Sequence, residues 1–97
     1  MAKLVSKTYG DALFAVAMED SRMDEFFEAA IALAEILRTN EDFSKLMNHP
    51  KIMKEDKVKI VEETFATRLP KEFVGLMTLM VEKGRANEML SVFEYFV

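Results

Sequence analysis

Hydrophobic residues recur at spacings of three and four along most of the chain, which is typical of helices with one buried face. The first such run contains Tyr9, Ala12, Leu13, Val16 and Ala17. Proline occurs only at positions 50 and 70, and glycine only at positions 10, 75 and 84, so long stretches contain no helix breaker. The pattern therefore predicts an all-α protein.

The apolar spacing and the breakers together divide the chain into six helices with short connections. We expect one domain over residues 1–97, folded as a compact six-helix antiparallel bundle. The predicted helices cover residues 5–18, 24–38, 41–47, 54–67, 71–83 and 87–96. In the second of these, the predicted inward face comprises Phe26, Phe27, Ala30, Ile31, Ala34 and Leu37.

Three local signals place helix ends within this scheme. Ser21 and Asp24 form an S-x-x-D pair that predicts the start of the second helix. Asn40 is expected to cap the third helix, because its side chain can accept a hydrogen bond from a free backbone N–H. Gly84 is expected to end the fifth helix in a left-handed conformation.

Charge and composition narrow the possible functions. Thirteen basic and 17 acidic residues give a net charge of −4, which argues against binding to a nucleic-acid backbone. The chain has no cysteine, and its single histidine, His49, has no partner at metal-ligand spacing. No glycine-rich phosphate loop or nucleophile motif is present. We therefore expect no catalytic site, no cofactor, no metal site and no membrane-spanning segment.

A cluster of lysines lies at the start of the fourth predicted helix. Acidic residues are interleaved with it, which predicts a salt-bridged helix surface rather than a basic patch. The lysines are Lys51, Lys54, Lys57 and Lys59, and the acids are Glu55, Asp56, Glu62 and Glu63.

The first and fifth predicted helices carry more apolar residues than one buried stripe requires. Residues 73–81 contain no charge at all. A helix that is apolar on every side is either central in its bundle or presents a second apolar face to a partner. The eight methionines favour the second interpretation, because methionine adapts well to a docked helix. Both interpretations remain open. The apolar pattern and the composition alone predict a helical binding module, and they do not identify its partner.

Several short motifs occur in the order that is found in a known family. Residues 9–17, YGDALFAVA, resemble the opening helix of the delta subunit of F-type ATP synthase, the oligomycin-sensitivity-conferring protein family. Further landmarks of that family resemble residues 40–43 (NEDF), 49–52 (HPKI), 56–57 (DK) and 83–85 (KGR), and also Phe65. Gly10 departs from the alanine that is common in the family, and Ala86 and Asn87 replace bulkier residues.

The resemblance implies a non-catalytic subunit that binds the N-terminal helix of an alpha subunit and links the catalytic head to the peripheral stalk. The chain would be the N-terminal domain, and an absent C-terminal part would meet the b subunit of the stalk. It would lie at the cytoplasmic face of the cell membrane as a peripheral part of the complex. The alternative is a generic helical adaptor unrelated to ATP synthesis.

The resemblance also places the alpha-subunit helix in a groove between the first and fifth helices. This is the same pair that carries excess apolar surface. A docked amphipathic helix would be held mainly by a few apolar anchors. The expected groove residues are Val5, Tyr9, Ala12, Val16, Leu76, Leu79, Met80 and Lys83.

Overall fold

Within residues 2–97, the chain forms six α-helices and one short 3₁₀ helix. The computed structural model describes the backbone of residues 2–97 and the side chains of residues 6–97, and no strand occurs within these residues. The helices are α1 (Ala2–Glu19), α2 (Met23–Thr39), α3 (Glu41–Met47), α4 (Lys54–Phe65), α5 (Lys71–Glu82), η1 (Ala86–Glu88) and α6 (Met89–Phe96). The predicted all-α class and the six helices are confirmed.

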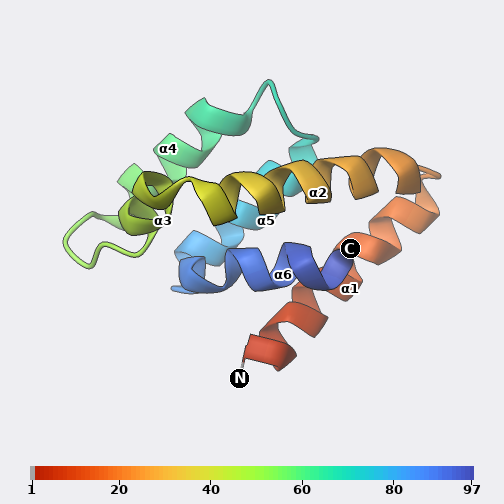
Figure 1. Cartoon of the computed structure of the whole chain (residues 1–97), viewed down its shortest axis with the longest axis horizontal. Helices are drawn as coiled ribbons and strands as arrows, with labels where there is room; N and C mark the ends of the chain where they lie inside the picture. Colours follow the sequence, from red (N-terminus) through yellow and green to blue (C-terminus); the bar gives the residue numbers. More distant parts are fainter. Residues whose placement is uncertain (1) are drawn as a thin grey trace.

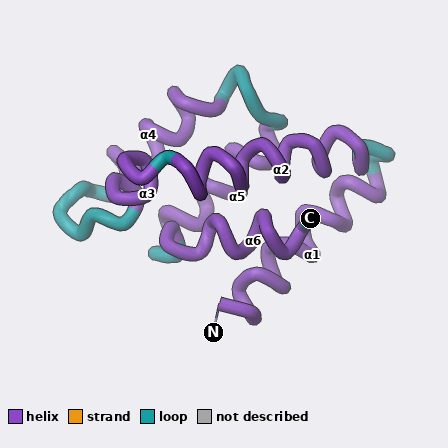
Figure 2. The backbone as a smooth tube through the Cα atoms, in the orientation of Figure 1, coloured by secondary structure: helices purple, strands orange, loops and turns teal. Residues whose placement is uncertain are grey.

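The helices α2 and α6 form the centre of the arrangement. They lie side by side and run in opposite directions, while α1 crosses obliquely past α6 (Figure 1). The pair α4 and α5 packs together, and short loops join the elements (Figure 2). The molecule measures 39 × 31 × 23 Å.

A cluster of phenylalanine rings joins α2, α5 and α6 in the core. Phe73 of α5 is fully buried, and its ring stacks on Phe93 at 5.5 Å between centroids. Phe26 of α2 meets Phe73 edge-to-face at 5.2 Å, and Phe96 meets it at 6.5 Å. Such offset and edge-to-face pairs add to the free energy gained by burying the rings.

The buried face of α2 differs from the predicted one. Phe26, Ala30 and Leu37 are buried as expected, but Phe27 and Ile31 are 43% and 46% exposed, so the prediction was wrong for these two. Leu33 is fully buried, and the sequence analysis did not include it. The buried residues repeat at spacings of four, three and four, and Phe27 and Ile31 are each one residue further round the helix.

The end of α1 contradicts the expected start signal of α2. Ser21 has a φ of 55°, and its N–H donates to the carbonyl of Met18 at 3.3 Å. The N–H of Arg22 donates to the carbonyl of Ala17 at 2.8 Å, which completes a Schellman motif. Ser21 therefore ends α1 and does not cap α2, whose N-cap is Arg22 without a side-chain hydrogen bond.

The other two predicted helix ends are confirmed. The side chain of Asn40 accepts a hydrogen bond from the N–H of Phe43 at 3.1 Å, and so caps α3. Gly84 has a φ of 73°, and the N–H of Arg85 donates to the carbonyl of Met80 at 2.7 Å. Gly84 thus ends α5 in the left-handed conformation.

The contact between α1 and α6 depends on a close approach at Gly10. A Cβ atom on Gly10 would lie 2.5 Å from Cδ1 of Tyr95, which is too short for a real contact. The hydroxyl of Tyr95 donates to Oδ1 of Asp11 at 3.0 Å and so holds the ring across Gly10. Tyr95 therefore occupies the space that a side chain at position 10 would need.

We expect Gly10→Ala to destabilise the protein by about 1 kcal/mol. Overpacking costs about 1–3 kcal/mol, while replacing glycine within a helix returns about 1 kcal/mol. In a Tyr95→Ala background, the same substitution should become stabilising, because only the helix-propensity gain remains. Urea unfolding of the four proteins of this cycle measures the change of sign. A stabilising Gly10→Ala in the wild-type background would contradict the proposed steric cause.

We also expect Asp11 to make the stability of the protein depend on pH in acid. The carboxylate accepts hydrogen bonds from Lys7 Nζ at 2.8 Å and from Tyr95, which lower the pKa of Asp11 below its ordinary value of 3.8. A lowered pKa stabilises the fold above the ordinary value, and this contribution is lost as the pH falls through the lowered pKa.

The substitution Asp11→Asn tests this linkage. At neutral pH the melting temperature of the variant should lie below that of the wild type. The gap should close as the pH falls from 3.8 through the lowered pKa, because the carboxylate is protonated first in the unfolded chain and then in the folded one. A gap that stays constant from neutral pH to about pH 2 would show that the charge of Asp11 does not stabilise the fold.

Candidate functional site

The predicted binding residues of α1 lie along one flank of the helix. Leu13 and Ala17 point into the core and are 4% and 0% exposed. Tyr9 and Val16 are half-buried and pack against the core, while Ala12 is exposed. Val5 lies outside the residues whose side chains are described. The flank therefore offers two anchored apolar side chains with a small, accessible alanine between them.

The predicted residues of α5 differ in how far they can be reached. Leu76 is half-buried, Leu79 is 39% exposed and Lys83 is exposed. Met80 is fully buried in the core, so it supports the surface from beneath and offers no area to a partner. We call the six accessible residues the α1/α5 surface: Tyr9, Ala12, Val16, Leu76, Leu79 and Lys83.

An ion pair ties the end of α1 to the start of α5. Arg22 follows α1, and its Nη1 donates to Oε2 of Glu72 at 2.8 Å. Glu72 lies four residues before Leu76 and therefore starts the same line along α5. Glu72, at the start of this line, is the residue of α5 that meets Arg22 at the end of α1.

The guanidinium of Arg22 is fixed from three directions. Its Nε and Nη2 donate to the two carboxylate oxygens of Glu25 at 3.0 and 2.8 Å, and its Cζ lies 4.9 Å from the centre of the Phe26 ring. The bonds to Glu25, and less strongly to Glu72, raise the pKa of Arg22 and keep it charged. The bonds from Arg22 lower the pKa of Glu25. This cluster positions α1 relative to α5.

The pair of Arg22 and Glu72 was not predicted from the sequence. The two residues are 50 positions apart, and no local motif links them. The only sequence signals are an arginine between two helices and an acid in the first turn of a helix.

The opposite flank of α1 carries the rest of its apolar excess. Phe14 and Met18 are 47% and 61% exposed. Phe14 meets Phe96 of α6 edge-to-face at 6.2 Å, so it lies on the side of α6. The α1/α5 surface therefore accounts for only part of the apolar surface that the sequence pattern indicated.

The expected salt bridges of the lysine cluster do not form. All four lysines and the four interleaved acids have described side chains, and none of them lies within ion-pair distance of an opposite charge there. On α4, Glu55 and Asp56 project from other sides of the helix than Lys54 and Lys57, because each residue turns the helix by about 100°.

The arrangement favours binding of a helix over chemistry on a small molecule. The α1/α5 surface combines accessible apolar side chains with one exposed cation, Lys83, and such a composition is typical of surfaces that bind an amphipathic helix. Among the side chains of residues 6–97, no group of three histidines or acids is placed to hold a metal ion. Across the described helices, none combines the length and the apolar character that crossing a membrane requires.

Comparison with known proteins gives one consistent result. Residues 5–97 match the family model described as ATP synthase delta (OSCP) subunit. The chain is 42% identical over 97 residues to the ATP synthase subunit delta of Lachnoclostridium phytofermentans, covering all of this chain and 53% of that protein. It is 32% identical over 97 residues to the protein of the same name from Brevibacillus brevis, covering 55% of that protein. The chain thus spans about half the length of these relatives.

Proposed function

The chain belongs to the ATP synthase delta (OSCP) subunit family, and from this we propose that it is the N-terminal, head-binding domain of a delta subunit. In this proposal the α1/α5 surface binds the N-terminal helix of an alpha subunit. A C-terminal part, corresponding to the other half of the longer relatives, joins the b subunit of the peripheral stalk. The domain itself catalyses no reaction and holds the head against rotation.

The observation that carries the proposal is that α1 and α5, which contact each other, each carry a line of accessible apolar residues. The Arg22–Glu72 ion pair joins the end of α1 to the start of α5. The Arg22 side chain is 28% exposed and that of Glu72 is 20% exposed. A partner helix therefore meets a surface that is already positioned, and pre-organisation of this kind lowers the entropic cost of binding. Family membership argues against the alternative of an adaptor unrelated to ATP synthesis.

The proposal also includes the location of the domain in the cell. It would lie at the cytoplasmic face of the cell membrane through its contacts with the other subunits of the ATP synthase. Its partners would be proteins, in agreement with the net charge of −4.

Calorimetric titration with a peptide of the alpha-subunit N-terminus tests this function. We expect saturable binding of one peptide per chain, together with a gain of helical circular dichroism beyond the sum of the two components. A peptide with proline at its centre is the matched control, because proline interrupts a helix. Absence of binding, or equal binding of the proline peptide, would contradict the proposal.

A further inference from the structure

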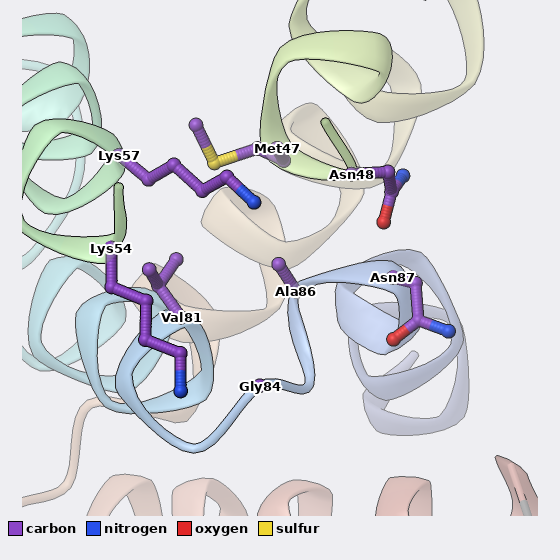
Figure 3. A pocket seen from close by; sticks show the side chains of 8 residues that line it. All are labelled: Met47, Asn48, Lys54, Lys57, Val81, Gly84, Ala86 and Asn87. Carbon is purple, nitrogen blue, oxygen red and sulfur yellow. The ribbon is translucent and has the colours of Figure 1, made fainter. Parts of the chain in front are cut away.

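A cavity of about 530 Å³ opens where α3, α4, α5 and η1 meet (Figure 3). Two lysines of α4, Lys54 and Lys57, extend into it, and Asn48 and Asn87 lie on the opposite side. None of the residues that line the cavity is acidic. The lining of the cavity is therefore positively charged, although the chain as a whole has a net charge of −4.

The two lysines receive no compensation from their own helix. They lie three residues apart, so like charges occupy neighbouring positions on one face, which is unfavourable. The positions three and four residues away from either lysine hold only lysine, proline or apolar residues. The pair is therefore not part of a salt-bridged helix surface.

The tertiary structure engages one of the lysines and leaves the other unpaired. Nζ of Lys54 donates to the carbonyl of Glu82 at 3.1 Å and so satisfies the end of α5. Lys57 is half-buried, and it makes no hydrogen bond or ion pair with the described residues. The buried part of a lysine is commonly its carbon stem, so the ammonium of Lys57, which has no partner among the described residues, can contact an anionic ligand in the cavity.

We propose that this cavity binds a phosphate group, either of inorganic phosphate or of a small phosphorylated molecule. An ammonium offers three N–H donors, so Lys54 can keep its bond to Glu82 and still contact an anion. Asn48 uses one amide proton on the carbonyl of Ser44 at 2.8 Å and keeps the second, and Asn87 adds a further carboxamide. A phosphate dianion would balance the charges of both lysines.

The size of the cavity agrees with this class of ligand. Small-molecule sites commonly have volumes of about 300–1,000 Å³. The volume of about 530 Å³ therefore leaves room for an organic group attached to the phosphate. The cavity shares no lining residue with the α1/α5 surface, so this inference does not depend on the proposed function.

Amide chemical-shift titration of the isotope-labelled chain, at constant ionic strength, tests the proposal. Sodium phosphate is one ligand and ADP is the other, and sodium chloride provides the background. We expect saturable shifts confined to residues 47–48, 54–57 and 84–87. Equal affinities would identify the phosphate ion itself as the ligand, and tighter binding of ADP would identify a phosphorylated molecule.

Two substitutions that each remove one positive charge distinguish a specific phosphate site from nonspecific electrostatic attraction of anions. Lys57→Gln should weaken phosphate binding by about tenfold and leave the fold intact, because a charged hydrogen-bond donor is lost from the cavity. Lys59→Gln, on an exposed position of the same helix, should leave the affinity unchanged.

Three results would overturn the inference. The first is shifts that do not saturate, or that follow added sodium chloride. The second is an equal loss of affinity in Lys57→Gln and Lys59→Gln. The third is binding of a polyglutamate peptide at these residues without binding of phosphate, which would assign the cavity to acidic side chains of a protein. If Lys57→Gln does not fold, the titrations of the wild-type chain still test the proposal, because they can give the first or the third of these results.

Discussion

Replacing Phe73 by alanine is expected to lower the free energy of unfolding by about 3–5 kcal/mol. Phe73 is fully buried and touches three other aromatic rings, from α2 and α6. The substitution would leave a cavity between three helices that cannot close by a local shift. Since domains of this size are stable by only about 5–15 kcal/mol, a large part of the stability would be lost.

Phe27→Ala is the matched control for this experiment. The same atoms are removed, but Phe27 is 43% exposed, so the cost should stay below about 1 kcal/mol. Urea unfolding followed by circular dichroism at 222 nm compares the two variants. Equal losses of stability would show that the aromatic cluster around Phe73 is not the centre of the core.

The substitution Ala12→Asp is expected to weaken binding of the alpha-subunit peptide by at least about 2 kcal/mol, or roughly thirtyfold. Ala12 is exposed in the free domain, and in the proposed complex it lies beneath the docked helix. The new carboxylate would therefore lose its water without gaining a partner. The free domain should keep its melting temperature to within a few degrees, because Ala12 does not point into the core.

Ala32→Asp provides the control for this prediction. Ala32 is also exposed, but it lies on α2, outside the α1/α5 surface. The substitution Ala32→Asp adds the same negative charge as Ala12→Asp, but outside the proposed binding surface. It should therefore leave the affinity for the peptide unchanged. If both variants bind equally weakly, the effect is one of net charge. If Ala12→Asp unfolds the domain, Ala12 supports the core and not the partner.

The helices could be predicted from the sequence because their causes are local. The spacing of apolar residues, the caps at Asn40 and Gly84 and the two prolines each act within a few residues. The prediction that Ser21 starts α2 was wrong. Its sequence context resembles a helix start, but its backbone adopts the left-handed geometry of a helix end. The distinction depends on the path of the chain after α1, which the motif does not encode.

The candidate site could be predicted only in part because it depends on which helices become neighbours. Excess apolar residues on α1 predicted either a central helix or a partner surface, but both flanks of the helix are apolar and the pattern does not rank them. The structure separates the flank of Tyr9 from that of Phe14, which faces α6. The Arg22–Glu72 pair and the packing of Tyr95 on Gly10 join residues 50 and 85 positions apart, beyond the reach of any local motif.

The central claim is that the α1/α5 surface binds the N-terminal helix of an alpha subunit. Amide chemical-shift mapping of the isotope-labelled chain, titrated with a peptide of that helix, tests this claim most directly. The account predicts the largest shifts on the exposed parts of α1 and α5, around Ala12, Leu79 and Lys83, with little change along α3 and α4. Shifts centred on the flank of Phe14 and Met18, or on the cavity of Lys57, with α5 unchanged, would contradict it.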